Sequence, residues 1–274
     1  MSTKRGQPQA GLLTLRLDSS SMERGALEAR THAIGGLGFQ LTDRNAAAEC
    51  LVELARTRCC SHVHLANAYT IALADQDDSY RRLLNQGLVF ADGKPISWLS
   101  RLARQIPRIQ QVRGPQLFLD VLDIGRSSGV RHFLLGSTDE LLERMRARLA
   151  ERFEGVEIAG SYSPPFRPLS AEEIADQDAL IRQSDADIVW VGLGTPKQDT
   201  EAARVAVSTA RPAVAVGAAF DFTAGALRVA PIWMQRAGLE WAFRLASEPR
   251  RLWRRYLFGN VRFVWAALRW RGME

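Results

Sequence analysis

The chain has 274 residues, 46% of them hydrophobic, and a formal charge of +6, which fits one large or two smaller globular domains with a sizeable core. Its three cysteines, two of them adjacent (Cys59 and Cys60), exclude a disulfide framework, and no CxxC or His/Cys cluster suggests zinc. The N-terminus lacks a long apolar run, so we expect no signal peptide, no spanning helix and an intracellular protein.

Residues 1–34 are polar with little periodicity, and we expect a flexible N-terminal segment. Beyond them, short apolar runs alternate with amphipathic stretches. Strands are expected at 38–41, 62–66, 88–91, 131–136, 156–160, 188–191 and 213–216, and helices at 46–56, 67–73, 80–84, 114–127, 140–153, 170–183 and from 197. This alternation predicts one α/β domain at 35–227, with a Rossmann-like, mostly parallel sheet flanked by helices.

The composition changes after residue 227. Residues 228–274 hold ten arginines against three glutamates, and five of the seven tryptophans. They predict a basic, aromatic, helical appendage that lies on an anionic membrane surface, because cations favour anionic lipids and tryptophan favours the headgroup layer. Binding of nucleic acid through arginine and stacked tryptophan is the rival, but no RNA-binding motif supports it. The appendage also allows an interface between copies in a homo-oligomer.

Asp92 is the candidate catalytic residue. The apolar run at 88–91 leads directly to Asp92 and Gly93, as expected for a buried strand that delivers a carboxylate to the edge of a sheet. Open α/β folds bind their ligands at the carboxyl edge of parallel strands, so Asp92 is a candidate acid or base. The alternative is an Asx turn completed by Gly93.

Two further strand exits are rich in small residues. The first suits a phosphate because backbone N–H groups point out of a glycine turn between strand and helix; its candidate residues are Gly192, Gly194, Thr195, Lys197 and Gln198. It matches neither the dinucleotide fingerprint nor the Walker A loop, and a plain βα turn is the alternative. The second exit, with Gly217, Phe220 and Asp221, lets a ligand approach the backbone closely, or simply packs a helix on the sheet.

Arg113 comes just before a predicted helix, where a cation opposes the helix dipole unless an anion occupies the gap. The alternative is an arginine that faces solvent. No DxD pair stands where it would hold a metal–nucleotide complex, because Asp185 and Asp187 precede their strand, at the opposite rim. The four histidines lack ligand spacing, and His62 and His64 share one strand face as structural residues. We therefore expect neither a metal nor a cofactor.

Together these stretches resemble the WecG/TagA/CpsF family of bacterial glycosyltransferases over residues 67–260. The matching segments are Asn67, residues 91–93, Arg113 with Gly114, and residues 192–198, 217–222, 230–236, 238–244 and 249–251. The segments at 230–236 and from 238 on are the most specific. Departures from the usual family pattern are Leu65, Tyr69 and Asp199, where members often carry Thr, Glu and Glu.

The resemblance implies an inverting transfer of one sugar from a UDP-sugar to a polyprenyl-diphosphate-linked sugar, at the inner face of the bacterial membrane, for cell-surface polysaccharide synthesis. Family donors carry N-acetylmannosamine, its uronic acid or glucose. The resemblance makes Asp92 the general base, puts Asn67 and Gln198 in its pocket, and puts Arg113 beside either the donor diphosphate or the acceptor. The basic segment would cover the site and bind the membrane, and its candidate residues are Arg228, Gln235, Arg236, Arg244 and Arg251. The rival function is a non-catalytic, nucleotide- or nucleic-acid-binding α/β protein.

Overall fold

The computed structural model describes residues 30–270, except for the side chains of residues 236, 251 and 254. Residues 1–29 of the expected flexible segment lie outside this range. Its last residues instead form strand β1 (Thr31–Ile34), which pairs antiparallel with β2 (Leu37–Gln40). Gly35 and Gly36 adopt positive φ angles of 62° and 77° in the two-residue turn. The folded region therefore begins before residue 35, the predicted boundary.

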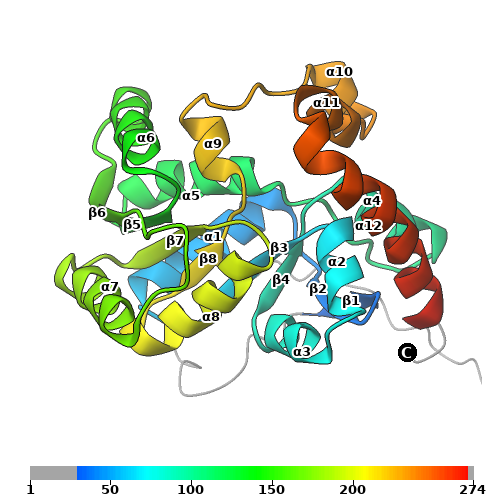
Figure 1. Cartoon of the computed structure of the whole chain (residues 1–274), viewed down its shortest axis with the longest axis horizontal. Coiled ribbons are helices and arrows are strands. Elements are labelled where there is room, and N and C mark those ends of the chain that lie inside the picture. Colours follow the sequence, from blue (N-terminus) through cyan, green and yellow to red (C-terminus); the bar gives the residue numbers. More distant parts are fainter. Residues whose placement is uncertain (1–29, 271–274) are drawn as a thin grey trace, which may run out of the picture.

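The central sheet has six strands, all parallel, in the order β4-β3-β8-β7-β5-β6 (Figure 1). The strands are β3 (His62–Ala66), β4 (Leu88–Ala91), β5 (Arg131–Gly136), β6 (Glu157–Tyr162), β7 (Ile188–Gly192) and β8 (Ala213–Ala215). The predicted Rossmann-like parallel sheet is thus confirmed. All six carboxyl ends lie at one edge, where ligands bind in such folds.

The helices of the α/β core are α1 (Arg44–Arg56), α2 (Ala68–Ala74), α3 (Asp78–Gln86), α4 (Lys94–Leu102), α5 (Gly114–Arg126), α6 (Asp139–Arg152), α7 (Ala171–Gln183), α8 (Lys197–Thr209) and α9 (Ala219–Thr223). Sequence signals fix several starts: Asp43 caps α1, Thr138 caps α6, and Ser170 forms a capping box with Glu173 on α7. The prediction missed α4. It also described 216–222 only as a strand exit, although most of that stretch belongs to the short helix α9.

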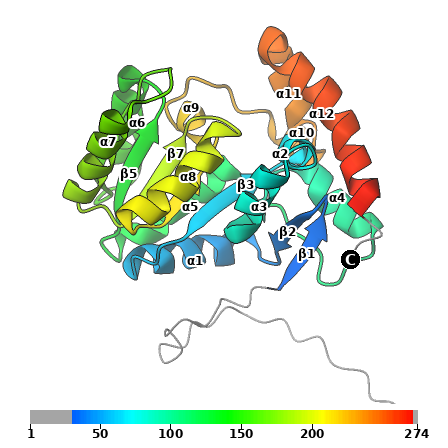
Figure 2. The same cartoon turned by 60° about the horizontal axis from the view of Figure 1, so that its bottom comes forward.

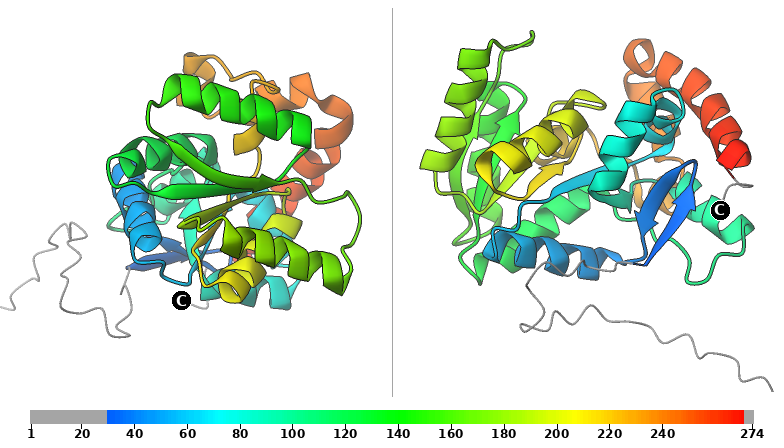
Figure 3. Two further views of the ribbon diagram at one scale, coloured as in Figure 1. Left: turned by 90° about the vertical axis from the view of Figure 1, so that its left-hand side faces the viewer. Right: turned by 90° about the horizontal axis from the view of Figure 1, so that it is seen from below.

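Helices cover both faces of the sheet (Figure 3). On one face α1, α5, α6 and α9 enclose the largest core cluster, at whose centre the fully buried Trp190 meets Phe118 edge-on at 4.9 Å. The indole N–H of Trp190 donates to Nδ1 of His132 at 3.0 Å, so this buried polar atom is satisfied. On the other face α7 and α8 pack on β5, β7 and β8.

The C-terminal appendage is helical, as predicted, and comprises α10 (Ile232–Arg236), α11 (Glu240–Ser247) and α12 (Pro249–Arg269). Helix α12 lies along α2 (Figure 2). Phe263 and Ala266 are buried in a third core cluster, with the β1–β2 hairpin, Ile71 and Leu84. The appendage is therefore part of the packed molecule, and removing it would expose apolar surface of α2.

An ion-pair network ties the strands together at the amino edge of the sheet. The carboxylate of Asp187, just before β7, accepts from Nε of Arg58 at 3.0 Å and from the backbone N–H of Arg131 at 2.9 Å. Asp185 pairs with both arginines at 2.6 Å. The guanidinium of Arg211, before β8, donates to the carbonyl of Ala186 at 2.8 Å. The two aspartates thus lie at the opposite rim from the candidate site, as predicted.

Candidate active site

The carboxyl edge of the sheet brings four separated parts of the sequence together. Asn67, Asp92, Gly192 and Gly217 follow or end β3, β4, β7 and β8, which are consecutive in the order β4-β3-β8-β7. The backbone N–H of Asp92 donates to the carbonyl of Ala66 at 2.8 Å, which fixes the end of β4 beside the end of β3. These four predicted site residues therefore share one edge, although up to 150 positions separate them in the sequence.

Asp92 is a half-buried carboxylate whose protonation is tuned by its neighbours. Its Oδ1 accepts from the backbone N–H of Gly114 at 3.4 Å, at the start of α5. Burial raises the pKa of Asp92 from 3.8 to about 6, and the nearby Glu240 adds to the rise, whereas the Gly114 N–H, Arg113 and Arg244 oppose it. A perturbed carboxyl group at a ligand-binding edge is a candidate catalytic group.

Gly114 allows the close approach on which this geometry depends. A Cβ atom at this position would lie 2.9 Å from Cδ1 of Leu65 and 3.2 Å from the carbonyl oxygen of Val216. Helix α5 can therefore begin directly over the ends of β3 and β8 only because residue 114 has no side chain. The same closeness presents its N–H to Asp92.

Asn67 lies at this edge as the N-cap of α2. Its side-chain oxygen accepts from the backbone N–H groups of Tyr69 and Thr70, at 3.0 and 3.3 Å. Thr70 completes a capping box by accepting from the backbone N–H of Asn67 at 3.2 Å. The amide oxygen is thus used within the helix cap, and the amide NH2 is the part of Asn67 that can serve a ligand.

The glycine turn after β7 is organised by Gln198, which is 2% exposed. Its side-chain Oε1 accepts from the backbone N–H of Gly194 at 3.0 Å, and the backbone N–H of Gln198 donates to the Gly194 carbonyl at 2.9 Å. The predicted phosphate turn therefore has its Gly194 N–H already bonded within the protein. Thr195 lies within 3.5 Å of the Gln198 amide, and Lys197 is exposed at the start of α8.

Behind this turn lies a buried polar network that the sequence pattern did not reveal. Asp199, next to Gln198 on α8, accepts from the hydroxyl of Tyr80 at 2.8 Å and bonds to Nδ1 of His64 at 2.9 Å. Nε2 of His64 in turn lies 2.7 Å from Nδ1 of His62. The network ties α3 and β3 to the first turn of α8, and so fixes the position of Gln198. The two histidines are structural, as predicted.

The exit from β8 divides between core and edge. Gly217 has a positive φ of 59°, and a Cβ there would lie 3.7 Å from the amide nitrogen of Gln198. Phe220 is buried against Gly192, and its ring centroid lies 5.9 Å from that of Phe118. It therefore packs between the glycine turn after β7 and the core. The Asp221 carbonyl accepts the N–H groups of residues 226 and 227, which ends α9.

Arg113 bonds to the C-terminal appendage. Its guanidinium donates to Oε1 of Gln235 at 2.7 Å and to Oε2 of Glu240 at 2.9 Å. Gln235 is itself held by a 2.7 Å bond to the carbonyl of Ala230. Arg113 is thus neither solvent-facing nor beside an empty gap: a carboxylate of the appendage takes the place predicted for an anion.

Other cations of the appendage converge on the same region. The Arg244 guanidinium lies 5.6 Å from the ring of Phe222 and is close enough to Asp92 to lower its pKa. Arg255 stacks on Tyr69 at 4.5 Å, and burial lowers the pKa of its guanidinium. Arg228 is exposed. The side chains of Arg236 and Arg251, also predicted site residues, lie outside the described set.

A cleft of about 740 Å³ opens next to Arg113. Its lining residues come from α5, α6, α9 and the start of the appendage: Arg113, Pro115, Gln116, Leu119, Arg148, Leu149, Glu151, Arg152, Phe222, Thr223, Val229 and Gln235. Among the residues that the structure describes, no group of three or more His, Cys, Asp or Glu side chains is placed to hold a metal ion. No helix within residues 30–270 is long and apolar enough to cross a membrane.

The fold and the residues at the carboxyl edge of the sheet define the class of protein, a Rossmann-like α/β protein whose ligand site lies at the carboxyl ends of parallel strands. The comparison with protein families is more specific. Residues 32–274 match the model described as the glycosyl transferase WecG/TagA/CpsF family, and the chain belongs to that family. It is therefore a glycosyltransferase, and the resemblance noted in the sequence is confirmed.

Proposed function

We propose that the protein is an inverting glycosyltransferase that moves one hexosyl residue from a UDP-sugar to a polyprenyl-diphosphate-linked sugar, in the synthesis of a bacterial cell-surface polysaccharide. The observation that carries this proposal is the position of Asp92. A carboxyl group with a raised pKa lies at the carboxyl edge of the sheet, beside the cations Arg113 and Arg244. Asp92 is thus a candidate base that lies next to two cations able to attract a phosphate group.

Asp92 acts as the general base. It takes the proton of the acceptor hydroxyl as that oxygen attacks C1 of the donor sugar from the face opposite the diphosphate. The bond between C1 and the diphosphate oxygen breaks, its electron pair leaves with UDP, and the anomeric configuration inverts. With a pKa of about 6, Asp92 is ionised at neutral pH and is a stronger base than an ordinary aspartate.

The leaving diphosphate is stabilised by cations and backbone donors. Arg113 is a candidate, because its guanidinium can bind a phosphate in the fork geometry that it now uses for Gln235 and Glu240. Arriving diphosphate would compete with the Glu240 carboxylate for this cation. Gln198 holds the glycine turn in shape at the same edge, where fixed dipoles stabilise developing charge.

The appendage supplies the membrane contact that a lipid-linked acceptor requires. Helix α12 presents an outward row of apolar side chains, each more than half exposed: Leu257, Phe258, Val261, Val264, Trp265 and Leu268. Trp233 on α10 is 64% exposed. Together with the arginines of the same helices, such a face suits a protein that lies at the inner surface of the bacterial membrane.

A donor screen tests the proposal. Purified protein is incubated with a short-chain lipid-diphosphate sugar and with UDP-linked N-acetylmannosamine, its uronic acid or glucose, with and without EDTA. We expect one donor to yield UDP and a β-linked product, at a rate that EDTA leaves unchanged. Binding of UDP without consumption of any sugar would instead support the non-catalytic alternative. An α-linked product would contradict the inverting mechanism.

A further inference from the structure

Helix α4 and the loop after it form an exposed apolar surface that the family assignment does not explain. Trp98 and Leu102 lie one helical turn apart and are 46% and 71% exposed, and Ile106, in the following loop, is 79% exposed. On the other side of the same segment Ile96 and Ser100 are fully buried. The segment is therefore firmly anchored while it holds large apolar side chains in solvent, where they cost free energy unless something covers them.

The charges around this surface identify what would cover it. Residues 93–119 contain no Asp or Glu, and the exposed arginines Arg101, Arg104 and Arg108 alternate with the apolar side chains. Interleaved arginine and large apolar side chains are typical of segments that insert into the headgroup layer of an anionic membrane. A protein partner of ordinary composition would not need a surface free of acidic groups.

The surface is continuous with the appendage. Gly238, in the turn between α10 and α11, packs so closely on Trp98 that a Cβ there would lie 2.6 Å from Cζ2 of the indole. Directly before this turn, Ile232 and Trp233 on α10 are 67% and 64% exposed. Figures 1 and 2 place α4 and α12 at the same end of the molecule. One lipid surface can therefore meet both elements.

The same segment is an excursion from the candidate active site. The chain leaves the edge of the sheet at Asp92, runs through α4 and returns at Val112, whose N–H donates to the carbonyl of Ala91 at 2.8 Å. The N–H of Ile109 donates to the buried hydroxyl of Ser100 at 3.0 Å, which holds the returning segment against α4. Asp92 and Arg113 are thus the two ends of the segment that carries the exposed surface.

We infer that the surface formed by Trp98, Arg101, Leu102, Arg104 and Ile106 (the α4 surface) docks on an anionic lipid membrane. It acts as a contact separate from α12 and sets the height of Asp92 above the bilayer. This inference rests on the proposed function for its purpose, presentation of a lipid-linked sugar to Asp92. Its physical claim, binding to lipid, is tested without any sugar transfer.

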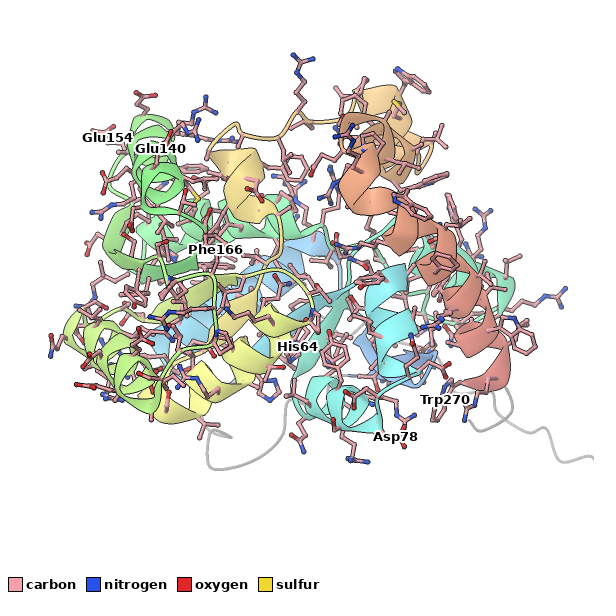
Figure 4. The ribbon with its side chains drawn as sticks, viewed as in Figure 1. His64, Asp78, Glu140, Glu154, Phe166 and Trp270 are labelled. Atoms are coloured by element: carbon pink, nitrogen blue, oxygen red, sulfur yellow. The ribbon has the colours of Figure 1, made fainter. Side chains whose placement is uncertain are left out.

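The test uses the full chain and sedimentation with vesicles, either of phosphatidylcholine alone or with added phosphatidylglycerol. The test variant is Leu102→Ser with Ile106→Ser. The matched control is Phe166→Ser with Val207→Ser, which are 84% and 74% exposed on other parts of the surface. Figure 4 shows Phe166 far from Trp270, which follows the last residue of α12. Thermal melting confirms that both variants are folded.

We expect the test variant to lose about tenfold or more of its binding to anionic vesicles, and the control to keep it. Arg101→Gln with Arg104→Gln should reduce the preference for anionic over neutral vesicles. Undiminished binding of the Leu102/Ile106 variant to anionic vesicles overturns the inference. If that variant also loses dimers that the wild-type protein forms, a second copy of the chain covers the surface instead.

Activity separates this inference from the proposed function. The Leu102/Ile106 variant should transfer sugar to a short-chain, water-soluble acceptor at the wild-type rate, and more slowly to a long-chain acceptor in vesicles. If the wild-type protein transfers no sugar to either acceptor, the proposed function fails, whereas the vesicle result still decides whether the α4 surface binds lipid.

Discussion

Replacement of Asp92 by Asn should lower activity and raise stability at the same time. A carboxyl group whose pKa rises from 3.8 to about 6 on folding destabilises the folded state at neutral pH by roughly 3 kcal/mol, because one pKa unit is worth about 1.4 kcal/mol. Asn has nearly the same shape and can still accept from the Gly114 N–H, but it carries no charge to desolvate. Loss of a positioned base lowers turnover by about 10²–10⁴.

The pH dependence gives the sign of the stability effect. The folded wild-type protein holds the Asp92 proton more tightly than the unfolded chain. The destabilisation caused by ionised Asp92 is therefore absent below about pH 4 and complete above about pH 6. Asp92→Asn should therefore melt at the wild-type temperature in acid, and on the order of 5 °C higher at pH 7.5.

Calorimetric or fluorescence-detected melts from pH 4 to 8, together with initial rates from the donor screen, measure both effects. Asp176→Asn on α7, where the carboxylate is exposed, is the matched control and should change neither. A variant that loses stability at neutral pH, or one that keeps its turnover, would refute the reasoning.

Three other outcomes follow from the same geometry. In the wild-type enzyme kcat/KM should rise with pH and level off above about 6 as Asp92 ionises, and a flat profile between pH 5 and 8 would count against a base with this pKa. Asp199→Asn should lower the free energy of unfolding in urea by about 1–3 kcal/mol, because His64 and Tyr80 lose a buried carboxylate partner. Since that carboxylate also positions Gln198, the variant should raise KM for the donor more than it lowers kcat. An unchanged KM would refute the positioning role. Gly114→Ala should lower stability by about 1–3 kcal/mol, since the new methyl group would lie 2.9 Å from a buried leucine, and an unchanged melting temperature would show that α5 can shift.

Local signals in the sequence were sufficient for most elements of the core. The strands at 62–66 and 131–136 were predicted with their observed bounds, because each is a short stretch that ends in apolar residues and is followed or closed by a turn residue. The capping box of Ser170 and Glu173 fixed the start of α7 in the same way. Helix α4 was missed because its apolar side chains do not share one buried face: Ile96 is fully buried beside the polar Ser100, whereas Trp98 and Leu102 are exposed.

Partnerships across the sheet could not be predicted, because hydrophobic periodicity does not encode the order of the strands. Asp199 meets His64 across 135 positions, and Arg113 meets Glu240 across 127. Both pairs depend on which elements become neighbours. The position of Asp92 was predictable, since a carboxylate directly after a buried strand must lie at the carboxyl edge. The carboxylate that Arg113 binds was not.

The ion-pair network of Asp185 and Asp187 has a mechanical consequence. It cross-links β5, β7 and the segments before β3 and β8 at the amino edge, where Arg58 and Arg131 hold both carboxylates. The sheet is thus clamped at one end, whereas the other end carries turns and the appendage. We therefore expect any deformation on arrival of a substrate to be confined to the carboxyl edge, where loops can vary without disturbing the register of the strands.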